Sequence, residues 1–110
     1  MEVSDEALTG ALVADVDPVI HAVSRLRIMT ALMGLDPGLN ISFSRLRAML
    51  DMTPGNLLAQ LQTLGAARYV SLEQHGRGRG SVTLIAATPE GRAAYTRYAS
   101  TIRSMLSFPV

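Results

Sequence analysis

Three of the four Thr-Pro or Asp-Pro pairs in this chain constrain its fold more than any other feature. They stand at Asp17-Pro18, Thr53-Pro54 and Thr88-Pro89, and apolar residues at helical spacing follow each of them. A Thr or Asp side chain can accept hydrogen bonds from the free N–H groups of a first helical turn, and proline already has the backbone angle of the first helical position. The pairs therefore predict that helices begin at these three places.

The first of these helices is expected to run from Pro18 to about Gly34, and Asp36-Pro37-Gly38 is expected to end it in a turn. Apolar residues recur three or four positions apart along this stretch, which is the spacing of one helix face. The side chains expected to face the core are Ile20, Val23, the stem of Leu26 or Arg27, and Ala31.

A second and a third helix follow closely. Residues 41–43 predict a short strand or an extended lead-in, and either Ser42 or Ser44 can cap a helix over about residues 44–51. A three-residue turn then leads to the third helix, which is expected to reach about Ala67. The apolar face of the second helix consists of Leu46 and Leu50 with Met49 beside them, and that of the third consists of Leu57, Leu61 and Leu64.

The pattern then changes from helical to extended. Residues 69–74 and 81–87 predict two strands of a hairpin, and the glycine-rich run 75–80 between them predicts its tip. The last helix begins at Thr88-Pro89 and is expected to reach about Ser107. The second strand is expected to place Val82, Leu84 and Ala86 on one face.

Two short helices joined by a three-residue turn and followed by a hairpin are the parts of a winged helix-turn-helix domain. The predicted fold is therefore mainly α with a small β-hairpin. We expect residues 1–16 to form an acidic arm or short helix, residues 17–87 the winged domain, and residues 88–110 a C-terminal dimerisation helix.

Composition excludes several classes of function. The 110-residue chain has no cysteine and two histidines, too few for a disulfide, a thiolate metal site or a convincing metal cluster. It lacks a Gly-rich phosphate loop and a paired His–carboxylate motif, so we expect neither an enzyme nor a cofactor. No apolar run is long enough to cross a bilayer and Met1–Asp5 lacks the basic start of a signal peptide, which predicts a cytoplasmic protein.

The charges are distributed unevenly. All ten basic residues are arginines at or after Arg25, whereas five of the nine acidic residues lie in the first seventeen positions. A basic domain behind an acidic leader suits a polyanionic partner, although the same charges also aid solubility. One of Arg25 and Arg27 is expected to make an internal salt bridge or hydrogen bond that fixes the first helix.

The third helix is the candidate for contacting double-stranded DNA. With its leucines turned inward, small and amide residues form the outer face, and residues 52–72 contain no acid. Asn56 and Gln62 have the groups to pair with adenine; alternatively Asn56 caps locally and Gln62 is only solvated. The absence of a side chain at Gly55 lets a phosphate approach the helix start. The expected contacts in this region are Thr53, Gly55, Asn56, Leu58, Ala59, Gln62 and Thr63.

The predicted hairpin tip supplies further cationic groups. Arg77 and Arg79 alternate with three glycines, so both guanidinium groups can lie along the minor groove or its phosphates. Alternatively the tip is a solvated loop. Arg45 and Arg47 on the second helix are expected to contact phosphates, or else are ordinary surface charges.

The last helix carries apolar residues at the spacing of a helix–helix seam, which predicts a homodimer. The alternative is that this face packs within its own chain. The residues of the expected dimer interface are Tyr95, Tyr98, Ile102, Met105 and Leu106.

Four stretches together resemble the MarR-type winged-helix transcriptional regulators, especially their short single-domain branch. The resemblance implies a DNA-binding homodimer that dimerises through its terminal helices, places the third helix in the major groove and acts as a regulator, expected to be a repressor; it identifies no effector. Two positions depart from the family pattern: Arg68 replaces a glycine after the third helix, and Leu58 replaces a small polar residue. The stretches are Ser24-Arg25-Leu26-Arg27-Ile28, Phe43-Ser44-Arg45-Leu46, Pro54-Gly55-Asn56-Leu57 and Ala87-Thr88-Pro89-Glu90-Gly91-Arg92.

The alternative function is a winged-helix module for protein–protein contact. In that case the arginine-rich tip would recognise an acidic protein surface instead of a duplex. Binding to plain duplex DNA that weakens steeply with salt separates the two hypotheses.

Overall fold

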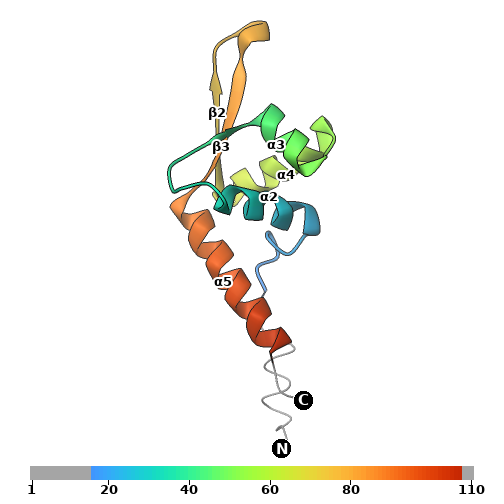
Figure 1. Ribbon diagram of the computed structural model, residues 1–110, viewed down its shortest axis with the longest axis vertical. Coiled ribbons are helices and arrows are strands. Elements are labelled where there is room, and N and C mark those ends of the chain that lie inside the picture. Colours follow the sequence, from blue (N-terminus) through green and yellow to red (C-terminus); the bar gives the residue numbers. More distant parts are fainter. Residues whose placement is uncertain (1–15, 108–110) are drawn as a thin grey trace, which may run out of the picture.

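The computed structural model describes residues 16–107, which form four α-helices and a three-stranded sheet (Figure 1). The hairpin of β2 and β3 projects at one end and α5 extends at the other, with α2, α3 and α4 between them. This arrangement confirms the predicted winged helix-turn-helix. The elements are α2 (Val23–Met33), β1 (Ile41–Ser42), α3 (Phe43–Leu50), α4 (Pro54–Ala66), β2 (Val70–His75), the short 3-10 helix η1 (Gly78–Gly80), β3 (Val82–Ala87) and α5 (Pro89–Leu106).

Helix α2 begins five residues later than the sequence predicted. Asp17 does cap, but it caps a turn: its Oδ1 accepts from the backbone N–H groups of Val19 at 2.9 Å and Ile20 at 3.3 Å. The Nε group of Arg25 donates to the carbonyl oxygen of Val19, which in a continuous helix would accept from the N–H of Val23. Ala22 is in an extended conformation, which also interrupts the helix. The expected start at Pro18 is therefore wrong.

The late start also changes which residues of α2 face the core. Val23, expected inside, is 72% exposed because it now occupies the first helical position. The buried residues of the helix are instead Ile28, Met29 and Leu32. Arg27 donates to the carbonyl oxygen of Leu50 at the end of α3, and Arg25 bonds within the chain as well. Both arginines thus make the kind of internal bond that was expected of one of them.

The helix-turn-helix follows the predicted capping. Ser42 caps α3 by accepting from the N–H of Arg45, and Thr53 caps α4 by accepting from the N–H of Asn56. Asp51 ends α3 in the left-handed conformation, with φ of 51°, which carboxylate and amide side chains tolerate better than most. The predicted leucine faces of both helices are buried. Met49 is the exception, because its side chain is 57% exposed.

The sheet has the order β1-β3-β2 and is antiparallel throughout. Ile85 of the central strand pairs with Ile41 on one side and with Leu72 on the other. Successive side chains of a strand point to opposite faces, and here Ile85 and Ala87 are buried whereas Val82 is 43% exposed. Val82, Leu84 and Ala86 do share a face, but the core face of β3 is the opposite one.

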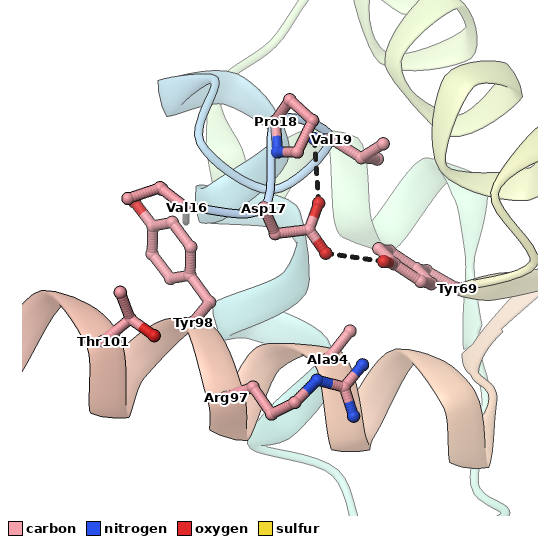
Figure 2. A pocket seen from close by; sticks show the side chains of 9 residues that line it. All are labelled: Val16, Asp17, Pro18, Val19, Tyr69, Ala94, Arg97, Tyr98 and Thr101. Atoms are coloured by element: carbon pink, nitrogen blue, oxygen red, sulfur yellow. Dashed lines mark hydrogen bonds between the residues drawn. The ribbon is translucent and has the colours of Figure 1, made fainter. Parts of the chain in front are cut away.

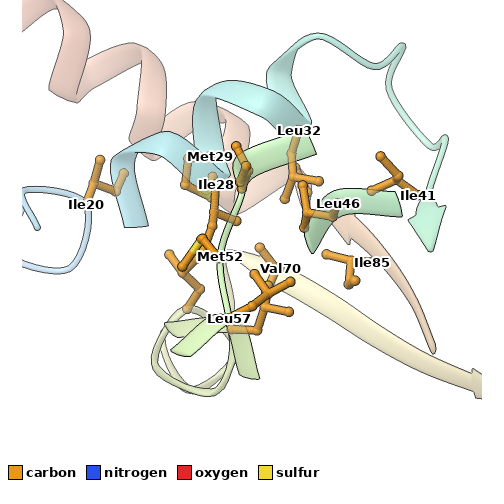
Figure 3. Close-up of a cluster of buried hydrophobic side chains, with 14 of the residues drawn as sticks. Ile20, Ile28, Met29, Leu32, Ile41, Leu46, Met52, Leu57, Val70 and Ile85 are labelled. Carbon is orange, nitrogen blue, oxygen red and sulfur yellow. The ribbon is translucent and has the colours of Figure 1, made fainter. Parts of the chain in front are cut away.

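One hydrophobic core joins the helices to the sheet. Figure 3 shows side chains from α2, α3, α4 and the strands converging between these elements. Burial of large aliphatic side chains is the main favourable term in folding, and nearly all of it here comes from Leu, Ile and Met. The fully buried large side chains are Ile20, Ile28, Met29, Leu32, Leu46, Leu57, Leu61, Leu64 and Ile85.

Backbone geometry fixes α5 against the end of α4. Arg68 takes the left-handed conformation with φ of 65°, so it adopts the geometry that a glycine would take easily. The N–H of Thr88 donates to the carbonyl oxygen of Tyr69 at 3.1 Å, and its hydroxyl donates to that of Arg68 at 2.6 Å. Gly91 is buried directly against Tyr69, where a Cβ atom would lie 2.0 Å from that carbonyl oxygen. The first turn of α5 therefore lies directly against the Arg68–Tyr69 backbone.

Within residues 16–107, no helix is long and apolar enough to cross a membrane. The same part of the chain contains no group of three or more side chains suited to hold a metal ion.

Candidate nucleic-acid interface

The outer face of α4 has the character that the sequence predicted. The leucine stripe is fully buried, and all seven residues expected to contact DNA in and before this helix are exposed, with Leu58 at 48%. The Thr63 hydroxyl donates back to the carbonyl oxygen of Ala59, whereas Asn56 lies in the first turn with its side chain outward. The chain thus presents a convex, acid-free helix face of small and amide side chains.

The start of α4 is open to an approaching anion. A Cβ atom built on Gly55 would meet no heavy atom within 4 Å among the described residues. The first turn contains no acidic side chain, and the helix dipole places partial positive charge there. Neither a side chain at Gly55 nor an acid in the first turn therefore opposes a phosphate oxygen that approaches this end.

Helix α3 carries two exposed arginines, and its start lies beside the wing. Arg45 and Arg47 are both exposed on α3. A hollow of about 180 Å³ between the start of α3 and the start of β3 is lined by Phe43, Ser44, Ser81, Val82 and Thr83. The structure therefore places the beginning of α3 next to the base of the wing tip.

The wing tip depends on glycine at two positions. Gly76 has φ of 86° and Gly78 has φ of 63°, a region that residues with side chains rarely adopt. Arg77 stands between these two glycines, Arg79 stands between Gly78 and Gly80, and both arginines are exposed, as the sequence predicted. Two exposed acids, Asp51 and Glu73, border the candidate surface, and Glu73 lies 3.2 Å from His75 on the same strand.

A chain of hydrogen bonds behind the α4 face was missed from the sequence. Arg25 Nη1 donates to Gln60 Oε1 at 2.9 Å, and Gln60 Nε2 donates to Asn56 Oδ1 at 3.1 Å. Gln60 stands four residues after Asn56, a spacing that allows such a pair on a helix. Arg25 lies on α2, far from Gln60 in the sequence, so the spacing of neighbouring residues could not predict this contact.

The predicted seam of α5 is partly used within the chain. Tyr98 is 8% exposed and its hydroxyl is hydrogen-bonded to His21 Nδ1 at 3.0 Å, while Tyr95 hydrogen-bonds to Thr30. Ile102 packs partly against the core, whereas Leu106 is 82% exposed. Tyr98 therefore has little exposed surface in the single chain, whereas Leu106 at the C-terminal end of the helix remains exposed.

A pocket of about 460 Å³ lies between the turn before α2 and α5. Figure 2 shows Asp17 in its wall, with one carboxylate oxygen toward the backbone of the turn and the other toward Tyr69. The Tyr69 hydroxyl donates to Asp17 Oδ2 at 2.5 Å. The remaining lining residues are Val16, Pro18, Val19, Ala94, Arg97, Tyr98 and Thr101.

The Asp17–Tyr69 bond raises the pKa of the Tyr69 phenol above its usual value of 10.0. The main cause is the hydrogen bond to the Asp17 carboxylate, which holds the proton; burial and the negative charge of Asp17 add to it, and Arg97 opposes it. A group whose pKa is raised by folding stabilises the fold below its unfolded pKa, and that contribution is lost as pH rises through the folded value.

We expect Tyr69→Phe to lower the free energy of unfolding by about 1.5 kcal/mol at neutral pH, the typical value of a hydrogen bond to a charged group. The difference between the wild type and the variant is expected to shrink as pH rises past the Tyr69 pKa. Urea unfolding of both proteins over an alkaline pH series measures this. Tyr95→Phe is the matched control, because its hydroxyl bonds to the neutral Thr30. A loss for Tyr69→Phe that stayed constant with pH would contradict the ionisation argument.

The fold and the exposed surface define a winged helix-turn-helix protein in which α4 has no acidic residue and the wing tip carries two arginines. The sequence matches the winged helix DNA-binding domain over residues 24–106. The chain therefore belongs to the family of winged helix DNA-binding domains. A search of curated protein sequences gave no match.

Solved structures agree with this assignment. A transcriptional regulator homologue protein from Pyrococcus horikoshii OT3 has a TM-score of 0.74 and 25% identity, over 92% of this chain and 94% of that one. A MarR-family transcriptional regulator from Rhodococcus sp. RHA1 has a TM-score of 0.66 and 20% identity, over 92% and 66%. The transcriptional repressor CouR, solved on a 23-mer DNA duplex, has a TM-score of 0.63 and 19% identity, over 89% and 63%. The resemblance to MarR-type winged-helix regulators is confirmed in the fold.

Proposed function

We propose that this chain is a transcriptional regulator that binds double-stranded DNA sequence-specifically as a homodimer and acts as a repressor. The exposed, carboxylate-free face of α4 carries the proposal, because it is the surface that a winged helix-turn-helix places in the major groove. The similar fold of CouR, a repressor bound to a duplex, supports the choice of partner and role.

The arginines supply the binding energy in this proposal, and the α4 face supplies the sequence preference. Arg45 and Arg47 are exposed on α3, and Arg77 and Arg79 are exposed at the wing tip. In this proposal all four contact phosphates on either side of the docked α4. The amide groups of Asn56 and Gln62 and the apolar Leu58 and Ala59 meet base edges. Thr53, Gly55 and Thr63 border these contacts.

The homodimer rests on α5. Its C-terminal end carries Ile102, Met105 and Leu106, of which Leu106 is strongly exposed in the single chain. Ile102 and Met105 are half-exposed beside Leu106, and a continuous group of apolar side chains at a helix end can pack against the same group of a second copy. A symmetric dimer would read two half-sites about 34 Å apart, which corresponds to roughly ten base pairs or a multiple.

We expect the wild-type protein to bind duplex DNA with a steep dependence on salt. Four arginines per subunit that each neutralise one phosphate give a dimer a slope of about −7 when log affinity is plotted against log salt concentration. Fluorescence anisotropy with a random-sequence duplex and with a site selected from a random pool measures both the slope and the preference.

Two outcomes would contradict the proposal. No affinity for any duplex at low ionic strength would favour the protein–protein module, which would use the arginines on an acidic protein surface. Equal affinity for selected and random duplexes would remove sequence specificity and leave a general DNA-binding protein.

A further inference from the structure

The orientation of the Asn56 side-chain amide follows from the groups that hold it. A guanidinium group has hydrogen-bond donors and no acceptor, so the Gln60 atom that faces Arg25 must be the oxygen. The Gln60 nitrogen then faces Asn56 and donates, so the Asn56 atom that receives it must be the oxygen. The direction of each amide is thereby fixed by the donors and acceptors of its neighbours.

The hydrogen bonds from Arg25 through Gln60 to Asn56 form a relay that is anchored at Arg25. Arg25 is half-buried and also donates from Nε to the carbonyl oxygen of Val19 at 2.6 Å, so two bonds hold its planar guanidinium group. Gln60 is half-buried as well, whereas Asn56 is exposed. The relay therefore runs from the interior of the domain to the surface, and its outer end is the NH2 group of Asn56.

We infer that Arg25, acting through Gln60, holds Asn56 with its NH2 group toward the DNA, so that Asn56 selects a base edge that carries hydrogen-bond acceptors. This inference rests on the proposed function. Arg25 and Gln60 are positioning residues in it, and Asn56 makes the contact.

The base preference that results differs from the usual pairing of asparagine with adenine. That pairing needs the side-chain oxygen to accept from adenine N6 while the nitrogen donates to N7. Here the bond from Gln60 takes one of the two lone pairs of the Asn56 oxygen and turns that oxygen toward Gln60, so the nitrogen is the group left to face the base. Guanine presents two acceptors side by side, N7 and O6, and has no donor at that edge. The relay therefore predicts guanine opposite Asn56 in each half-site.

Reversing the relay should reverse the preference. Gln60→Glu replaces the NH2 group by a second acceptor, so the carboxylate still pairs with Arg25 but now accepts from the Asn56 nitrogen. The Asn56 oxygen then faces the groove and is expected to select adenine N6 or cytosine N4. Ala66→Glu is the charge-matched control, because it adds a carboxylate to an exposed position of α4 away from Asn56.

The binding test measures relative affinities for the four bases at that position. We expect the wild type to prefer guanine over adenine by about tenfold, Asn56→Ala to reduce this ratio to near one, and Gln60→Glu to invert it. Arg25→Lys keeps a donor toward Gln60 and should retain the preference, whereas Arg25→Met should lose it. An unchanged guanine preference in Gln60→Glu, or a wild-type preference for adenine, would overturn the inference.

A second measurement needs no DNA. By NMR, the side-chain NH2 protons of Gln60 should exchange with solvent about threefold to tenfold more slowly than those of Gln62, an exposed glutamine of the same helix. Asn56→Ala should abolish that difference, and equal exchange of the two glutamines in the wild type would overturn the relay. If the protein bound no duplex, the proposed function would fall, while this comparison would still decide whether the relay exists.

Discussion

Replacing Gly91 by alanine is expected to lower the free energy of unfolding by about 3 kcal/mol or more. A Cβ atom at this position would lie 2.0 Å from the carbonyl oxygen of Tyr69 and 2.8 Å from its carbonyl carbon. Both are backbone atoms, so no side-chain rotation can relieve the clash. Relief requires α5 to move away from the end of α4, which breaks the bond from the Thr88 N–H to Tyr69.

Urea and thermal unfolding measure this effect directly. For a domain of this size, a loss of that order lowers Tm by roughly 10–20 °C. Gly55→Ala is the matched control. Gly55 also lies in the first turn of a helix that begins with a Thr-Pro pair, Thr53-Pro54, but it has open space around it. Alanine there should leave stability unchanged or raise it by about 0.5 kcal/mol. Equal stability of Gly91→Ala and the wild type would mean that α5 is not held against Tyr69.

The sequence predicted those features that depend on neighbouring residues. Ser42, Thr53 and Thr88 cap their helices through bonds to N–H groups three residues ahead. Residue type and spacing were sufficient to place the starts of α4 and α5, whereas for α3 they left Ser42 and Ser44 as alternative caps. The leucine stripe of α4 follows from helical periodicity, and with it the outward face of the same helix. Eleven residues expected to contact DNA are exposed for this reason.

What could not be predicted depends on contacts between elements distant in sequence. Asp17-Pro18 has the residues of a helix start, but Tyr69 holds the Asp17 carboxylate and Arg25 takes the carbonyl oxygen of Val19. Gly91 gave no signal, since glycine in a first helical turn is unremarkable until the Tyr69 backbone is seen beside it. Local propensity is therefore overridden where a second element supplies a stronger partner.

Tyr69 makes two contacts with elements distant in the sequence and lies next to the end of α4. Its carbonyl oxygen accepts from the start of α5, its hydroxyl donates to the turn before α2, and it directly follows Arg68, which ends α4 in the left-handed conformation. The orientation of α4 relative to α5 is thus set by backbone contacts at one residue. In a dimer joined through α5, the same contacts would set the distance between the two α4 helices, and hence the half-site spacing that the protein accepts.

Replacing both Arg77 and Arg79 by alanine is expected to weaken DNA binding by roughly 10²–10³-fold at about 0.15 M salt. The double substitution removes four phosphate contacts from a dimer, which changes the salt slope from about −7 to about −3.5. The loss should be nearly equal on selected and random duplexes, because these arginines contact the backbone or the groove and carry little base information. Anisotropy titrations across a salt series measure both quantities.

The control separates a wing contact from a general effect of charge. Arg97→Ala with Arg103→Ala removes the same two charges from α5, where both side chains are exposed and lie outside the proposed DNA surface. If net charge alone drove binding, the two double variants would weaken it alike. If the wing grips the duplex, the slope should change by about 3.5 units for the wing variant and by much less for the α5 variant, because counterion release depends on direct phosphate neutralisation. An unchanged slope for Arg77→Ala with Arg79→Ala would remove the wing from the binding mechanism and leave α3 and α4 to hold the DNA.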